Sequence, residues 1–210
     1  MLESAASGSV CARARRATAV TRGLRTRLAW STPGGWIAGI RQVASPNFDA
    51  RPPGIEIDTL ILHYISLPPG VFSGDAVERL FLNQIGPNDD PRLVPLTGLK
   101  VSAHFLIRRS GELVQFVATR DRAWHAGPST LLERERCNDF SVGVEIEGDG
   151  EHRFTEAQYR RLGQLVMVLR ECHPLRLVAG HEDVAPGRKQ DAGPRSEEHT
   201  SELQSRLHLV

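Results

Sequence analysis

Short apolar segments bounded by turn-forming residues recur between residues 59 and 180. The segment from Thr59 to Ile65 is rich in β-branched and apolar residues and is followed by Pro68-Pro69-Gly70, so it predicts a buried strand. Residues 102–108 and 113–117 flank the pair Ser110-Gly111, which predicts a hairpin. Residues 175–179 predict a last strand.

The segment 141–147 alternates regularly between two kinds of side chain. In a strand, alternate residues point to opposite faces of the sheet. One face therefore carries Val142, Val144 and Ile146, and the other carries Gly143, Glu145 and Glu147. A face with two acids is either solvated or the floor of a site.

Helical periodicity is clearest after Thr155. Thr155 and Gln158 form a capping-box pattern, and apolar residues recur at helical spacing as far as Leu169. A second helix is expected near residues 75–82. Strands and helices mixed in this order predict an α/β (mixed α+β) fold with a central mixed β-sheet flanked by helices.

The length of 210 residues suits one globular domain, which we expect to span residues 36–194. Residues 1–35 contain little periodic hydrophobicity and predict a disordered or mis-called N-terminal extension. Their arginine-rich, acid-poor composition leaves an organelle transit peptide as the alternative.

Charge, hydropathy and cysteine content indicate which partners and which cellular location to expect. A net charge of +1 argues against a nucleic-acid partner. No apolar run approaches the roughly 18 residues that span a bilayer, so no membrane association is expected. The three cysteines match no zinc or disulfide pattern and are expected to be reduced. Because no apolar segment follows the N-terminal arginines, a cytoplasmic location is predicted.

Two histidines stand at the ends of predicted strands, and an aspartate follows the second by ten positions: His63, His181 and Asp191. A catalytic zinc needs three protein ligands and an open position for water, which this set would satisfy. Spacing alone is a weak argument, since no local HExxH motif is present and a single histidine is more often structural.

Five segments add specificity because they occur together and in one order. They are His63-Tyr64-Ile65-Ser66-Leu67-Pro68-Pro69-Gly70, Val101-Ser102-Ala103-His104, Ala123-Trp124-His125-Ala126-Gly127, residues 134–141 and residues 180–194. Together they resemble the AmpD family, the cytoplasmic 1,6-anhydro-N-acetylmuramyl-L-alanine amidases of muropeptide recycling. The resemblance runs from about Trp36 to Pro194 and implies the zinc amidase and peptidoglycan-recognition fold.

The resemblance also implies roles for individual residues. It makes His63, His181 and Asp191 the ligands of Zn²⁺, Glu145 the acid/base residue and Lys189 its cationic partner. Strand alternation cannot choose between Glu145 and Glu147; the resemblance favours Glu145.

Five further positions are expected to contact substrate: Arg136, Lys100, Trp124, His125 and Tyr64. A muropeptide carries several carboxylates, which cations would anchor. Surface solvation is the alternative for Arg136 and Lys100, and core packing for Trp124. Tyr64 stands where asparagine is more familiar in the family, and His104 is expected to be structural.

The last residues depart from the family pattern. The string from Arg195 to Ser205 matches the translation of a sequencing-library adapter. Residues 195–210 are therefore predicted to be a non-native tail, and finding them encoded at the genomic locus would contradict this.

The predicted activity is hydrolysis of the amide bond between (1,6-anhydro-)N-acetylmuramic acid and L-alanine, in a monomer whose partner is a small muropeptide. One alternative is an extracytoplasmic peptidoglycan amidase, which would need an export signal. Another is a non-catalytic peptidoglycan-binding module, which the loss of a zinc ligand would mark.

Overall fold

A six-stranded mixed sheet organises the chain. The computed structural model describes residues 28–31, 35–149 and 151–187. The strand order is β12 (Leu177–Gly180), β5 (Thr59–Ile65), β11 (Ser141–Glu147), β6 (Phe105–Ile107), β7 (Leu113–Gln115) and β3 (Arg41–Gln42). The four strands from β12 to β6 are parallel neighbours, β6 and β7 form the antiparallel hairpin, and β3 is parallel to β7. The predicted fold class is confirmed.

Smaller elements surround this sheet. Two-residue strands pair as β1 (Ala29–Trp30) with β2 (Ile37–Ala38), β4 (Phe48–Asp49) with β8 (Arg122–Ala123), and β9 (Thr130–Leu131) with β10 (Arg134–Glu135). The helices are α1 (Ala76–Phe81), α2 (Glu156–Leu169) and α3 (His181–Val184), with short 3₁₀ turns at Val94–Leu96 and Cys137–Asp139.

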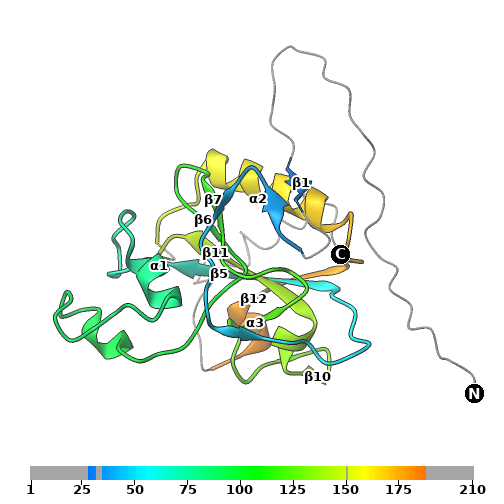
Figure 1. Ribbon diagram of the computed structural model, residues 1–210, viewed down its shortest axis with the longest axis horizontal. Helices are drawn as coiled ribbons and strands as arrows, with labels where there is room; N and C mark the ends of the chain where they lie inside the picture. Colours follow the sequence, from blue (N-terminus) through cyan, green and yellow to red (C-terminus); the bar gives the residue numbers. More distant parts are fainter. Residues whose placement is uncertain (1–27, 32–34, 150, 188–210) are drawn as a thin grey trace, which may run out of the picture.

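Helix α2 covers one face of the sheet (Figure 1). Both hydrogen bonds of the predicted capping box between Thr155 and Gln158 are present. The apolar residues of α2 pack on side chains of β5 and β11 that share this face, among them Leu60, Leu62 and Val144. The alternation of these strands therefore determines that their other side chains face away from α2.

The opposite face has two apolar clusters. Helix α1 packs over β6 and β7 through residues such as Leu80 and Phe81. At the other end, Ile61 of β5 and Ala179 of β12 pack with Val184 of α3. His63, Gly143, Glu145 and Glu147 lie on this face by strand alternation. These candidate site residues therefore lie on the face of the sheet that α2 does not cover.

The sequence predicted the two central strands, residues 59–65 and 141–147, to the residue. The strand expected over 102–108 is shorter, because Ser102 and His104 make tertiary hydrogen bonds instead. The described fold begins at Leu28, upstream of the expected start at Trp36: β1 pairs with β2, and the Trp30 indole donates to the Val168 carbonyl at 3.1 Å.

The cysteines differ from the expectation in one respect. Cys137 is a free, buried thiol, as predicted. Cys172 is disulfide-bonded, so the expectation of a reduced thiol is wrong for this residue. Spacing of three cysteines along a chain carries no information about which of them meet in space. Among the described residues, no helix is both long and apolar enough to cross a membrane.

His173 joins the N-terminal strands to the body of the fold. Its Nε2 lies 2.8 Å from the Thr119 hydroxyl, and its ring meets the Trp30 indole edge to face at 6.0 Å. Burial, and secondarily the Arg51 charge, lower the pKa of His173 to about 4.

This lowered pKa predicts a measurable loss of stability in mild acid. The unfolded chain binds the proton with an ordinary histidine pKa of about 6.5, so the neutral ring stabilises the fold fully above that pH. The contribution falls as the pH drops towards 4 and is smaller by about 2 kcal/mol at pH 5. Urea unfolding at pH 7.5 and pH 5 should show a smaller acid effect in His173→Gln than in wild type. An equal acid effect in both proteins would contradict the prediction.

Candidate metal centre and active site

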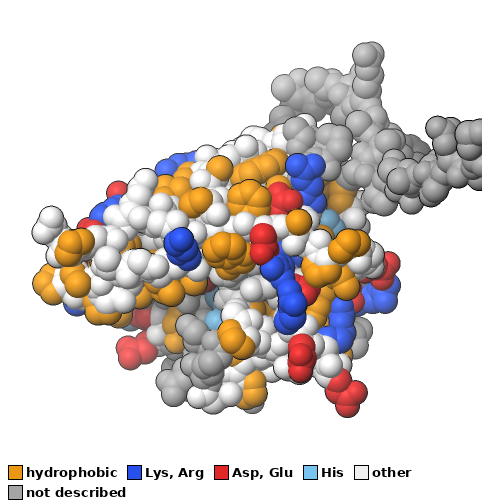
Figure 2. Space-filling view, turned by 60° about the horizontal axis from the view of Figure 1, so that its bottom comes forward, with side chains coloured by type: hydrophobic (Ala, Val, Ile, Leu, Met, Phe, Trp, Pro, Cys, Tyr) orange, Lys and Arg blue, Asp and Glu red, His pale blue; other side chains and the backbone are white. Residues whose placement is uncertain are grey.

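Three buried histidine rings converge beside β5. His63 lies within β5, His181 is the first residue of α3, and His125 follows β8. The Nδ1 atoms of His63 and His181 are 3.0 Å apart, and Nε2 of His63 is 3.1 Å from Nδ1 of His125. On the face shown in Figure 2, histidine atoms reach the surface only in small patches. The rings are therefore held inside the fold.

The pair His63–His181 fits a metal centre. Two nitrogens bound to one tetrahedral zinc at about 2.0–2.1 Å lie about 3.4 Å apart, close to the observed 3.0 Å. Nε2 of His181 lies 3.4 Å from the Ala126 carbonyl oxygen, which only accepts hydrogen bonds. With its proton on Nε2, His181 presents the Nδ1 lone pair to His63, and imidazole bound to metal usually has its other nitrogen engaged in this way.

The third expected ligand, Asp191, and the cationic partner, Lys189, lie outside the described residues. Within the described part of the chain, no group of three or more histidine, cysteine, aspartate or glutamate side chains is arranged to hold a metal ion. The roles of Asp191 and Lys189 therefore stay predictions.

The register of β11 against β5 distinguishes the two acids. Glu145 pairs directly with His63 in the parallel ladder, and its side chain is almost buried. Glu147 pairs with Ile65 and accepts from the Arg108 guanidinium at 3.3 Å and from the Arg109 backbone N–H at 2.8 Å. Glu145 is thus the acid next to the histidine pair, and Glu147 belongs to an ion pair.

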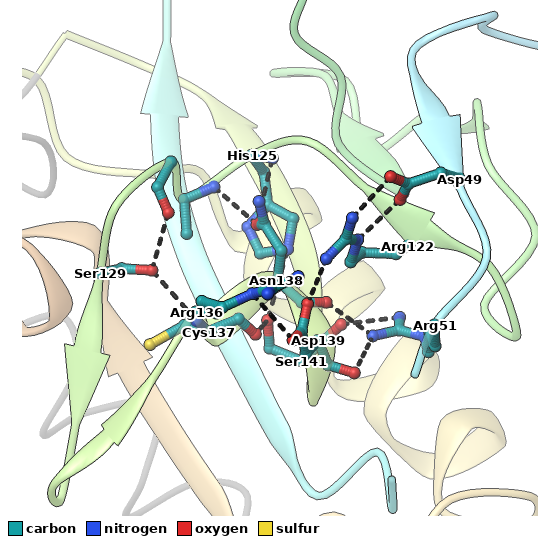
Figure 3. Close-up of polar contacts among 12 residues, drawn as sticks. Asp49, Arg51, Arg122, His125, Ser129, Arg136, Cys137, Asn138, Asp139 and Ser141 are labelled. Atoms are coloured by element: carbon teal, nitrogen blue, oxygen red, sulfur yellow. Dashed lines mark hydrogen bonds and ion pairs between the residues drawn. The ribbon is translucent and has the colours of Figure 1, made fainter. Parts of the chain in front are cut away.

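The turn that enters β11 is held by Arg51 (Figure 3). Its guanidinium donates to the carbonyl oxygens of Asn138 and Asp139 at 2.8 and 2.9 Å, of Ser141 at 2.8 Å and of Thr119 at 3.1 Å. Burial lowers the pKa of Arg51 to about 10, which leaves the group cationic at neutral pH. Arg51 therefore fixes the starting position of the strand that carries Glu145.

A second arginine ties this turn to the N-terminal part of the fold. Arg122 donates to both carboxylate oxygens of Asp49 and to Asp139, at 2.5–2.6 Å (Figure 3). The hydrogen bond from Arg122 lowers the pKa of Asp49, and one from the Trp124 side chain lowers it further. Trp124 thus has a polar anchor at the edge of the site and is only partly exposed.

The residues expected to contact substrate lie in different surroundings. Arg136 has a left-handed backbone (φ 60°) and a side chain that is 66% exposed, 3.2 Å from Asp139. Lys100 is exposed in the loop before Val101. Tyr64 follows His63 in β5, so alternation directs its side chain to the opposite face of the sheet. The structure therefore leaves Arg136 and Lys100 accessible and does not bring Tyr64 to the histidines.

His125 and His104 are more buried than side chains that contact a substrate in an open groove would be. His125 is 9% exposed and contacts His63, and burial lowers its pKa well below the ordinary range. His104 is fully buried: its Nδ1 accepts from the Gly143 N–H and its Nε2 faces the Asp121 carbonyl, so it has the expected structural role. The contact between His125 and His63 was not predicted, because residues 62 positions apart give no sequence signal of contact.

Comparison with known proteins decides the family. The family model described as N-acetylmuramoyl-L-alanine amidase matches residues 53–194. The chain belongs to the N-acetylmuramoyl-L-alanine amidase family. It is 47% identical over 162 residues to the 1,6-anhydro-N-acetylmuramyl-L-alanine amidase AmpD of Escherichia coli K12, covering 76% of this chain and 88% of that protein. It is 43% identical over 162 residues to AmpD of Haemophilus influenzae, with the same coverage.

Solved structures agree with this family membership. A crystal structure of a selenomethionine AmpD derivative superposes with a TM-score of 0.74 at 42% identity, covering 81% of this chain and 97% of that one. The amidase AmiD of Escherichia coli, in complex with anhydro-N-acetylmuramic acid-L-Ala-D-γ-Glu-L-Lys, superposes with a TM-score of 0.52 at 26% identity, covering 76% of this chain and 61% of that one. The resemblance to the AmpD family is confirmed.

Proposed function

We propose that this amidase hydrolyses the bond between (1,6-anhydro-)N-acetylmuramic acid and L-alanine in muropeptides, using one Zn²⁺ ion. The observation that carries the proposal is the pair of histidine nitrogens 3.0 Å apart with Glu145 in register beside it. The AmpD relatives are named for this reaction, and an AmiD structure holds an anhydromuramyl peptide.

The proposed reaction assigns a separate task to each residue. His63 and His181 would hold the metal, with Asp191 as the third ligand. Bound zinc supplies a water of lowered pKa and polarises the amide carbonyl. Glu145 takes the proton of the attacking water and returns it to the amine that leaves with L-alanine. Lys189 would stabilise the oxyanion that develops on the carbonyl oxygen. Arg136 and Lys100, both exposed, would attract the carboxylates of the peptide.

Zinc dependence predicts that a chelator abolishes the activity. The chain is incubated with 1,6-anhydro-N-acetylmuramyl tripeptide, with and without chelator, and the products are followed by mass spectrometry. Free tripeptide should appear only without chelator and reappear when zinc is restored, because water at neutral pH is a poor nucleophile without the metal. Tripeptide release that a chelator leaves unchanged would contradict the zinc assignment.

The division of the chain is part of the proposal. We assign residues 36–194 to the amidase domain, with β1 (Ala29–Trp30) paired to it from just before this range, and residues 195–210 to a non-native tail. The family match ends at residue 194, directly before the adapter-like string. If the wild-type chain releases no tripeptide, the assay is repeated with residues 195–210 replaced by the C-terminal segment of an AmpD relative. Inactivity of both chains would count against the function itself.

We also propose a monomer in the cytoplasm whose partner is a small muropeptide, without nucleic acid or membrane. The alternative is an amidase that acts on peptidoglycan outside the cytoplasm, where disulfides persist. Cell fractionation with thiol labelling of Cys172 separates the two locations. A non-catalytic binding module is disfavoured, since His63, His181 and Glu145 are all present.

A further inference from the structure

A chain of hydrogen bonds runs from the metal-facing histidine to the backbone of the turn before β11. It passes from His63 to His125, from His125 to Ser141, and from Ser141 to the carbonyl of Cys137. Each member is buried. Hydrogens are not seen directly, so their positions have to be assigned from the partners along the chain.

At the Cys137 end of the chain, the direction of hydrogen bonding is fixed. Its carbonyl oxygen can only accept, so the Ser141 hydroxyl, 2.6 Å away, donates to it. The hydroxyl has one proton, and its oxygen is then left as an acceptor towards Nε2 of His125 at 3.4 Å. Nε2 of His125 therefore carries the ring proton.

The proton on His125 in turn determines the proton position on His63. In a neutral imidazole with its proton on Nε2, Nδ1 is an acceptor. Nδ1 of His125 faces Nε2 of His63 at 3.1 Å, so His63 donates from Nε2 and keeps a lone pair on Nδ1. That lone pair is directed towards Nδ1 of His181. The chain thus selects the tautomer of His63 that can bind a metal.

The position of His125 is itself constrained. The Asn138 side-chain oxygen accepts from the backbone N–H groups of His125 and Ala126, at 3.3 and 2.8 Å. The imidazole ring lies against Gly143, where an added Cβ would come within 2.6 Å of ring atom Cδ2. The neighbouring Ala126 carbonyl faces Nε2 of His181. Residues 125 and 126 therefore contact both metal-facing rings on the side away from the metal.

We propose that His125 is a positioning residue that sets the tautomer and ring orientation of His63 through the Ser141–Cys137 hydrogen-bond chain. The inference rests on the proposed zinc site and goes beyond it, since it removes His125 from the substrate groove. Partners of this kind hold a metal-binding histidine in the correct tautomer, and their loss costs about 10- to 100-fold in metal affinity.

The test compares zinc affinity and tautomer in matched variants. Zinc affinity is measured by competition with a chromophoric chelator for wild type, His125→Phe, His125→Gln and Ser141→Ala, each checked for folding by circular dichroism. His125→Phe should lose about 10- to 100-fold in affinity, and His125→Gln should recover part of it because its amide oxygen accepts a hydrogen bond. Ser141→Ala should shift the affinity in the same direction by less. His173→Gln is the control and should match wild type, because His173 is half-buried and its ring contacts Thr119 and Trp30.

A second readout does not depend on bound metal. Nitrogen chemical shifts of the metal-free protein should show His63 and His125 protonated on Nε2, and His63 should lose this preference in Ser141→Ala. Wild-type zinc affinity in folded His125→Phe, or in both other variants if that one does not fold, overturns the proposal. So does a metal-free wild type with His63 protonated on Nδ1. If wild type binds no zinc, the proposed function fails, and the tautomer alone decides on the hydrogen-bond chain.

Discussion

Glu145→Gln is expected to lower kcat/KM for the anhydromuramyl tripeptide by about 10²- to 10⁴-fold. Glu145 lies opposite His63 in the parallel ladder, next to the proposed metal pair. The amide keeps the size of the carboxylate but cannot take a proton from water at neutral pH, so the loss falls on the chemical step. Folding and zinc affinity should remain near wild type, and steady-state kinetics with a zinc-competition assay checks both.

Glu147→Gln is the matched control, two residues further on the same strand face. The substitution weakens the hydrogen bonds that the Glu147 carboxylate accepts from the Arg108 guanidinium and from the Arg109 backbone N–H. It should therefore lower the free energy of unfolding by about 1–3 kcal/mol. Its kcat/KM should stay close to wild type at a temperature where it is folded. The reverse pattern, an active Glu145→Gln and an inactive Glu147→Gln, would assign the acid/base role to Glu147.

Arg51→Met is expected to destabilise the fold by about 3–5 kcal/mol, because four backbone carbonyls lose a charged donor inside the fold. Methionine fills part of the same space, so the loss reflects hydrogen bonds more than packing. Urea unfolding of wild type and variant at pH 7.5 measures the difference.

Arg51→Lys separates charge from geometry. An ammonium keeps the positive charge but lacks the planar fork that reaches several carbonyls, so its stability should lie between the other two proteins. If Arg51→Lys is as stable as wild type, the several hydrogen bonds of the planar guanidinium are not what holds the turn. If Arg51→Met has the stability of wild type, Arg51 does not hold the turn before β11.

The sequence allowed the central strands to be predicted because they carry strong local patterns. Residues 59–65 are mostly apolar or β-branched, which predicts a buried strand. Residues 141–147 alternate, so the face on which each side chain lies could be deduced without a structure. The capping box of Thr155 and Gln158 is equally local. By contrast, β1 has two residues and no periodicity, and it is ordered by distant partners such as the Val168 carbonyl.

The site was predictable only in part, for the same physical reason. Motif resemblance identified His63, His181 and Glu145, and the structure brings these together. Alternation alone could not separate Glu145 from Glu147, because the distinction depends on the register with β5 and on Arg108, which follows β6. The position of His125 depends on Asn138 and Gly143, whose contacts with it follow from folding and not from spacing.

The order of strands in the sheet has a consequence for biosynthesis. The two metal-facing histidines are 118 residues apart, since β12 returns to pair with β5 only near the end of the described chain. At translation rates of about 5–20 residues per second, the first emerges from the ribosome on the order of 10 s before the second. A nascent chain that ends before residue 181 lacks one of the two proposed histidine ligands. At the proposed site, zinc loading would therefore follow the pairing of β12 with β5 and could not precede it.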